Sequence, residues 1–272
     1  MPNPDPHQNI RRSKQLPPYR AVFAVDVRDF SSSPSAHQEQ LSKDIPQLLS
    51  LAFEQRELGR LWDNRVFGSS TGDGYYFGVD AVDTPFLVDP FLGELQEVLE
   101  AHDEVVRARS RDLRLRLRAS VHIGPVPEAG PVTAMNETHR LLDSEPVRAV
   151  LADSDPDVTF LAAILSERVY TDVVAGDYVK QRPSQFAKNT LQVKSYQGTG
   201  YLYTPKPSAN PQRLGQIEGL TPVQSEDVAE AQQRRTEPDK PQHVHNEFSG
   251  NGGSGIVIQA GRMGDVHGPG SR

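Results

Sequence analysis

An apolar run that ends in a carboxylate restricts the fold more than any other feature of the sequence. Residues 21–25 (Ala-Val-Phe-Ala-Val) are apolar at every position, which predicts a central strand covered on both faces. Asp26 follows directly, and a polar turn with several serines comes next. An acid at the end of a strand can be the N-cap of the next helix or a cation ligand, and both interpretations are open for Asp26 taken alone.

A second acidic residue lies in a glycine-flanked turn about 47 residues later. Gly72-Asp73-Gly74 separates two β-rich runs, a pattern that is typical of a hairpin. Alone, such a tripeptide is most simply a β-turn. Asp26 and Asp73 together could face each other and share divalent cations. Mg²⁺ that holds a nucleotide phosphate usually takes one or two protein carboxylates, and substrate oxygens complete its shell.

Hydrophobic spacing divides the rest of the domain into alternating helices and strands. The expected elements are, in chain order, a strand and turn at 19–31, a helix from about Asp44 to Leu61, a hairpin at 65–79, a helix that begins at Asp89-Pro90, a strand at 113–123, a helix at 133–144, a strand at 158–165 and a hairpin at 191–203. In the strand at 113–123, apolar residues alternate with Arg114, Arg116 and Arg118, and this arginine row is interpreted as a solvated or interfacial face. The order favours one α+β domain.

These motifs together resemble the class III nucleotide cyclases. In that family the first strand ends in an Asp, a phosphate-binding turn follows, and a Gly-Asp hairpin supplies a second metal ligand. The resemblance covers about residues 19–204 and implies a ferredoxin-like α+β catalytic domain, an antiparallel-rich sheet with helices on one face. It also implies a homodimer with shared active sites that acts on a nucleoside triphosphate.

The resemblance implies two Mg²⁺ or Mn²⁺ ions as cofactors. Asp26, Asp73 and the carbonyl oxygen of Val27 would hold them. Asn136 and Arg140 are four residues apart, so they share one face of the expected helix. They match an Asn and an Arg that, in the family, steady the ribose and the transition-state phosphate from the opposite subunit. A guanidinium suits that role because it is permanently charged and offers a fork of donors.

The resemblance places the substrate-binding residues in two turns. Phe30, Ser31 and Ser32 belong to the turn whose backbone N–H groups would bind phosphate oxygens. Ser69 stands four residues before Asp73, where adenylate cyclases carry a purine-reading Lys and guanylate cyclases carry a Glu. A site without such groups discriminates poorly for purines, because rejection depends on buried polar groups that would be left unpaired.

This departure resembles the pyrimidine cyclases of bacterial antiphage defence. We therefore expect a uridylate cyclase that converts UTP to cyclic UMP and diphosphate, the cyclic nucleotide being a second messenger that activates an effector. Three alternatives stay open: a cytidylate cyclase that acts on CTP, an adenylate cyclase with unusual base reading, and an inactive cyclase-like adaptor. The presence of Asp26, Asp73, Asn136 and Arg140 argues against the adaptor.

Composition argues against several other classes of protein. The net charge of −7 gives no basic footprint for nucleic acid. The sequence contains no cysteine, so a disulfide framework and thiolate metal sites are excluded. No segment approaches the ~20 apolar residues of a membrane span, and the first residues hold no apolar signal core, so we expect a cytoplasmic protein.

The two ends of the chain differ in composition from the domain. Residues 1–18 and 205–245 are polar and rich in proline, which predicts a disordered N-terminus and a disordered linker. Within residues 246–268, the segment 256–260 (Ile-Val-Ile-Gln-Ala) is short, β-prone and bounded by glycines. It resembles the bacterial amyloid signalling motifs related to the RIP homotypic interaction motif, which implies a sensor protein with a matching motif as a partner. An unstructured tail, or a strand that docks on the domain, is the alternative.

Overall fold

The computed structural model describes residues 13–209, with the exception of 33, 110–113, 128–132 and 195. The predictions for residues 1–12, for most of the linker and for the motif at 246–268 concern residues outside this part and stay predictions. Within the described part of the chain, no helix combines the length and the apolar character that crossing a membrane would require.

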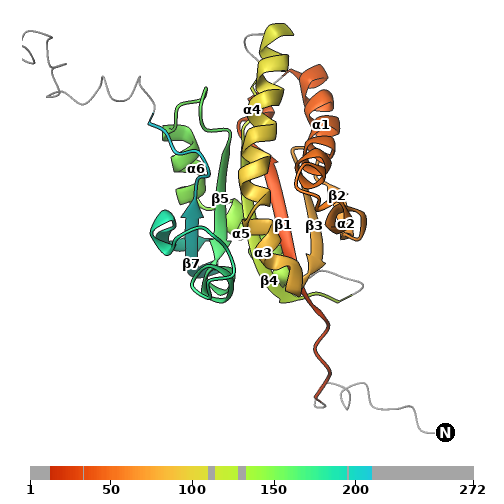
Figure 1. The fold of residues 1–272 in the computed structure, drawn as a ribbon, viewed down its shortest axis with the longest axis vertical. Helices are drawn as coiled ribbons and strands as arrows, with labels where there is room; N and C mark the ends of the chain where they lie inside the picture. Colours follow the sequence, from red (N-terminus) through yellow and green to blue (C-terminus); the bar gives the residue numbers. More distant parts are fainter. Residues whose placement is uncertain (1–12, 33, 110–113, 128–132, 195, 210–272) are drawn as a thin grey trace, which may run out of the picture. The chain divides into compact units, whose positions relative to one another are not determined.

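A seven-stranded sheet with the order β2-β3-β1-β4-β5-β7-β6 carries the domain (Figure 1). The strands are β1 (Tyr19–Val27), β2 (Val66–Ser70), β3 (Gly74–Asp80), β4 (Leu117–Pro125), β5 (Leu161–Ser166), β6 (Ala187–Val193) and β7 (Tyr196–Tyr203). Neighbouring strands are antiparallel except β4 and β5, which run parallel. β1 lies between β3 and β4, and residues 21–25 are buried, as their apolar run predicts.

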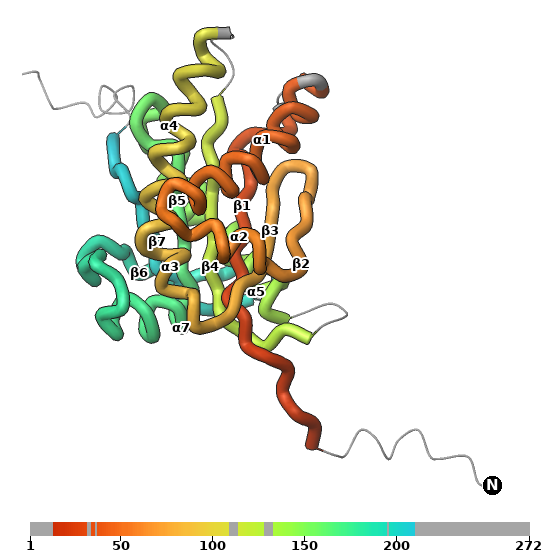
Figure 2. The backbone as a smooth tube through the Cα atoms, turned by 45° about the vertical axis from the view of Figure 1, so that its right-hand side comes forward, coloured from red at the N-terminus to blue at the C-terminus, as the bar shows by residue number. Residues whose placement is uncertain are grey.

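The first four strands and two long helices form a ferredoxin-like unit. The α-helices in the described part of the chain are α1 (Ser35–Glu54), α2 (Gly59–Asp63), α3 (Thr84–Val88), α4 (Phe91–Arg109), α5 (Thr133–Leu142), α6 (Glu145–Asp153) and α7 (Glu167–Val169), and the two long ones are α1 and α4. In chain order β1, α1, β2, β3, α4 and β4 make a βαββαβ arrangement. Within it α1 and α4 lie side by side (Figure 2). The predicted α+β fold is therefore confirmed.

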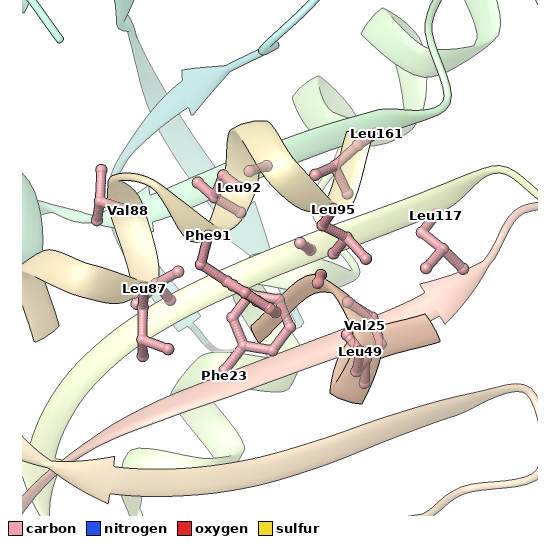
Figure 3. Close-up of a cluster of buried hydrophobic side chains, with 14 of the residues drawn as sticks. Phe23, Val25, Leu49, Leu87, Val88, Phe91, Leu92, Leu95, Leu117 and Leu161 are labelled. Atoms are coloured by element: carbon pink, nitrogen blue, oxygen red, sulfur yellow. The ribbon is translucent and has the colours of Figure 1, made fainter. Parts of the chain in front are cut away.

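The main core lies between the sheet and the pair α1 and α4. Phe23 and Val25 of β1 pack with Leu49 of α1 and Phe91 of α4 (Figure 3). Phe53 of α1 stacks on Phe91, with ring centroids 3.9 Å apart and ring planes 17° apart. Full burial of one such side chain contributes roughly 1.5–3 kcal/mol. This cluster fixes β1 against the helices, and with it the carboxylate at the end of β1.

The opposite face of the sheet is covered as well, which corrects the expectation of helices on one face. Val22 of β1 packs with Ala134 of α5, and Leu141 of α5 joins Val147 and Leu151 of α6 in a second cluster on β5. Successive residues of a strand point to opposite faces, so a strand that is apolar at every position needs a cover on both. The helices α5 and α6 follow the βαββαβ unit in the chain and provide that cover.

The first helix begins and ends earlier than its sequence pattern indicates. The pattern predicts a helix from about Asp44 to Leu61, but α1 spans Ser35–Glu54 and α2 is separate, so Pro46 lies inside α1 rather than in its first turn. A proline inside a helix removes one backbone hydrogen bond. Tertiary packing of the helix supplies most of its stability, and Ile45 and Leu49 on either side of Pro46 are buried.

Candidate active site

Asp26 and Asp73 lie next to each other at one end of the sheet. The antiparallel register of β1 and β3 puts Asp26 opposite Gly74. The backbone N–H of Val27 donates a hydrogen bond to the carbonyl oxygen of Asp73 at 2.8 Å. The carboxylate of Asp73 is exposed and accepts a hydrogen bond from the hydroxyl of Thr71 at 3.1 Å. The structure thus brings together the two acidic residues that the sequence predicts as neighbours.

The glycines of the hairpin allow this close approach. Gly72 has a φ of +94°, in the left-handed region that glycine adopts without strain. A Cβ atom at Gly74 would collide with the carbonyl oxygen of Val25 and would lie 3.1 Å from the Cα of Asp26. Glycine at this position therefore keeps the turn that carries Asp73 against the end of β1.

Asp26 is a buried carboxyl group held by one arginine. It is only 9% exposed, and Arg118 of β4 donates to both of its oxygens, from Nε and from Nη2, at 2.7 Å each. The pKa of Asp26 is raised from its ordinary value of 3.8 to about 7, chiefly by burial; Arg118 opposes this rise, and the nearby Asp73 and Asp143 add to it. The bidentate pair favours the ionised form and burial opposes it. Burial is the larger effect, so a proton or a cation is favoured at this carboxyl group.

A polar pocket of about 410 Å³ opens beside this pair. Four residues predicted for the site line it: Val27, Phe30, Ser31 and Asp73. The other lining residues are Arg28, Asp29, Arg118, Arg148 and Ala152. The pocket therefore receives arginines from the turn after β1, from β4 and from α6, and guanidinium groups suit an anionic ligand with oxygen acceptors.

The turn after β1 is anchored to the helix that follows it. Residues Phe30–Ser32 form one 3₁₀ turn, and the ring of Phe30 packs against the main core. The carbonyl oxygen of Phe30 accepts a hydrogen bond from the side-chain amide of Gln38 of α1 at 3.3 Å. Ser31 lines the pocket, whereas the side chain of Ser32 lies outside the described residues. The backbone of this turn is thus held beside the pocket rather than free to move away from it.

Asp26 lies behind its pair with Arg118 and is not itself among the residues that line the pocket, and three further predicted site residues do not line it either. Asn136 is exposed on α5, and Arg140 of the same helix donates to the carbonyl oxygen of Val193 at 3.2 Å. Ser69 is exposed on β2, and its hydroxyl donates to the carbonyl oxygen of Ser70 at 3.4 Å. Within the described residues of one chain, Asn136, Arg140 and Ser69 are therefore outside the pocket that Asp73 lines.

The interpretation of the arginine row as a solvated or interfacial face is wrong for Arg116 and Arg118. Arg116 is 5% exposed, and its Nε donates to the carbonyl oxygen of Thr159 at 2.8 Å. Burial above all, together with the nearby charges of Arg28 and Arg114, lowers the pKa of Arg116 to about 10. The side chain of Arg118 is 14% exposed. The segment before β5 and the paired carboxylate cover this end of β4.

The donor set at the end of β1 fits a divalent cation that shares its shell with a ligand. Among the residues that the structure describes, no group of three or more His, Cys, Asp or Glu side chains could hold a metal ion. Two adjacent carboxylates and a main-chain carbonyl nevertheless suit a hard cation such as Mg²⁺, which commonly takes its remaining ligands from phosphates and water. The raised pKa of Asp26 also marks a carboxylate whose charge is poorly compensated.

No protein-family model and no curated protein matches the sequence. Solved structures with a similar course of the chain are nucleotide cyclases. The adenylyl cyclase CyaB from P. aeruginosa matches at 13% identity and a TM-score of 0.45, over 68% of this chain and 92% of that one. A bacterial light-regulated adenylyl cyclase matches at 13% identity and a TM-score of 0.47, over 71% and 93%. The guanylyl cyclase Cya2 matches at 13% identity and a TM-score of 0.39, over 75% and 96%. Because one fold serves many functions, the site itself has to carry the argument about activity.

Sequence reasoning missed Arg118 and Arg148 as pocket residues. Arg118 lies opposite Asp26 in the antiparallel register of β1 and β4, and this pairing joins residues far apart in the sequence. The alternation of the sequence at 113–123 offered a partial signal, because it predicts three arginines on one face. Nothing in the local sequence around Arg148 indicates a site.

Proposed function

We propose that this chain is a metal-dependent nucleotide cyclase that converts UTP to cyclic UMP and diphosphate. The observation that supports the proposal is the pocket in which the turn at 28–31, Asp73 and Arg118 meet beside the desolvated carboxyl group of Asp26. It combines adjacent carboxylates for cations with guanidinium groups and backbone for a phosphate chain. That combination is what phosphoryl chemistry needs, since its catalysis consists mainly of positioning and charge stabilisation.

Each element of the pocket has a role in this proposal. Asp26, Asp73 and the carbonyl group of Val27 hold two Mg²⁺ or Mn²⁺ ions. When bound, such ions lower the pKa of the ribose 3′-hydroxyl and stabilise charge on the α-phosphate. The backbone of the turn at Phe30–Ser32 orients the phosphates. Arg118, released from Asp26, pairs with phosphate oxygens through the same fork of donors.

Asn136 and Arg140 act in the pocket of a second copy of the chain. Asn136 is exposed on α5, Arg140 is half-buried, and neither lines the pocket of its own chain, which supports a homodimer with two shared sites. Asn136 then steadies the ribose, and Arg140 stabilises the charge that develops during attack on the α-phosphate. A single protomer has little activity in this scheme, because no chain completes a site alone.

The short side chain at Ser69 supports a pyrimidine substrate. Its hydroxyl is exposed and donates only to a neighbouring carbonyl oxygen, so no charged group stands at this position to read a purine. UTP is the first choice and CTP the second. Cyclic UMP would serve as a second messenger in antiphage defence, activating an effector, and residues 246–268 would recruit a sensor protein with a matching motif.

The test is to incubate the purified full chain with Mn²⁺ and equal amounts of ATP, GTP, CTP and UTP, and to resolve the products by mass. Cyclic UMP should be the main product, and the isosteric variant Asp73→Asn should give none above background. Cyclic CMP as the main product would reassign the substrate within the pyrimidines. A purine product would overturn the interpretation of Ser69, and no cyclic product at all would leave the adaptor alternative.

A further inference from the structure

Three arginines from separate elements line one pocket in an acidic chain. Arg28 comes from the turn after β1, Arg118 from β4 and Arg148 from α6. The net charge of the whole chain is −7, so a general basic surface does not explain their convergence. Guanidinium groups present planar forks of donors that match phosphate oxygens. Three such forks from separate elements fit a ligand with several anionic groups better than a ligand with one.

Two of these arginines are already engaged by firm internal contacts. Arg118 donates twice to the buried carboxylate of Asp26 at 2.7 Å. Arg28 donates through Nη1 to the carbonyl oxygen of Leu151 at 3.2 Å, and its Nε lies 3.0 Å from a carboxylate oxygen of Asp29. The contact to Leu151 joins the turn directly to α6, so these two parts of the pocket wall are held together.

The contact that engages Arg148 is an exposed ion pair. Its Nη2 lies 2.9 Å from a carboxylate oxygen of Asp143, and the two side chains are 48% and 49% exposed. An ion pair exposed to this degree contributes little, because solvent and salt screen it and both side chains lose freedom. An anionic ligand can therefore take the place of Asp143 at little cost to the fold.

The helix that carries Arg148 is fixed in place. Val147 and Leu151 are completely buried and pack against β5. Arg148 and Ala152 both line the pocket and are four residues apart, so they mark one face of α6. One side of α6 is thus anchored in the core, while another side forms a wall of the pocket.

We propose that α6 is the wall that recognises the end of a polyphosphate chain, and that Arg148 binds the oxygens of its terminal phosphate. The inference rests on the proposed function in that the natural ligand is a nucleoside triphosphate. Only the phosphate groups are recognised here, so inorganic triphosphate with Mg²⁺ binds against the same face of α6. Arg148 is then a binding residue that exchanges an exposed carboxylate partner for a phosphate.

The test measures binding of inorganic triphosphate and of inorganic phosphate to the full chain by calorimetry, with Mg²⁺ present. Arg148→Ala should weaken triphosphate binding ~10-fold, since a hydrogen bond to a charged group is lost. Arg148→Lys should fall between the alanine variant and the wild type, because it keeps the charge without the fork. Inorganic phosphate should respond less than triphosphate to either change.

Arg168→Ala is the matched control. Arg168 also forms an exposed pair with an aspartate, Asp172, at 3.4 Å with both side chains 54% exposed. It lies at the other end of β1, where its guanidinium carbon is 5.0 Å from the ring centroid of Tyr19. The triphosphate affinity of this variant should equal that of the wild type.

The outcomes separate this inference from the proposed function. A triphosphate affinity for Arg148→Ala within about twofold of the wild type would overturn the inference, even in an active cyclase, and so would a wild type that binds no triphosphate. Triphosphate binding that depends on Arg148 but not on Arg168 supports it. This binding result would support the inference even if the wild type formed no cyclic nucleotide. In that case the proposed function would fail and the inference about Arg148 would not.

Discussion

The buried carboxyl group of Asp26 should make the stability of the fold depend on pH in a defined direction. Burial raises the pKa of Asp26 from 3.8 to about 7, so the folded state binds this proton more tightly than the unfolded chain does. Between these two values the folded state therefore carries more protons than the unfolded state. The free energy of unfolding must then fall as the pH rises through this window, and the proton's contribution is lost above about pH 7.

The size of this loss in the free energy of unfolding follows from the two pKa values of Asp26. Each pKa unit corresponds to ~1.4 kcal/mol, so the change from 3.8 to about 7 corresponds to ~4 kcal/mol. The 9% exposure of Asp26 leaves little solvent screening to reduce this figure. Asp26→Asn keeps the shape of the side chain and removes its titration. The amide next to Arg118 changes the free energy of unfolding by the same amount at every pH, so this change cancels when the free energies at two pH values are compared.

The assay is urea unfolding of the full chain from about pH 4 to about pH 8 with a chelator present, followed by the fluorescence of Trp62. Trp62 is the only tryptophan in the sequence and is 8% exposed. The wild type should lose ~4 kcal/mol relative to Asp26→Asn between about pH 4 and about pH 7. Asp63→Asn, which changes an exposed carboxylate on α2, serves as the control for the substitution itself. Parallel profiles for the wild type and Asp26→Asn would refute the view that Asp26 is desolvated.

Four further experiments probe the hairpin, the dimer and the core. Asp73→Ala should lower cyclic-nucleotide formation at least ~100-fold, while thermal melting shifts little because the side chain is exposed. Mixing Asp73→Ala with Arg140→Ala protomers should restore part of the activity, and no recovery in verified heterodimers would contradict shared sites. Gly74→Ala should destabilise the fold by about 1–3 kcal/mol in urea, since its Cβ meets the carbonyl oxygen of Val25. Phe53→Ala should cost about 3–5 kcal/mol by the same measurement, because it empties part of an aromatic cluster.

Features encoded in short stretches of sequence could be predicted. The run at 21–25 is apolar at every position, and it forms the buried central strand. Gly72 and Gly74 flank the turn at Asp73, and they allow the hairpin to approach β1. In both cases the pattern of adjacent residues determines the local structure. The proximity of Asp26 and Asp73 also needs the pairing of β1 with β3, which the family resemblance implied.

Features that depend on distant pairing could not be predicted. Arg118 reads as one member of an alternating row, and only the register of β1 and β4 shows that it faces Asp26. Arg148 reads as a surface residue of a short helix until the packing of Leu151 fixes α6 beside the turn. Consecutive residues of β1 are apolar and point to opposite faces of the sheet, so this strand implies a cover on the second face as well. The helices that provide it are not specified by that strand.

The pairing of Arg118 with Asp26 links the two kinds of ligand that the proposed reaction requires. While Arg118 binds both oxygens of Asp26 through Nε and Nη2, a cation at this carboxylate and a phosphate at this pair of donors each meet a group that is already engaged. A cation at Asp26 and a phosphate at Arg118 each compete with the same ion pair. Once one of them has broken it, the other finds its partner free. We therefore expect cation and triphosphate to bind better together than either binds alone, through a residue that the sequence pattern places on a solvated or interfacial face.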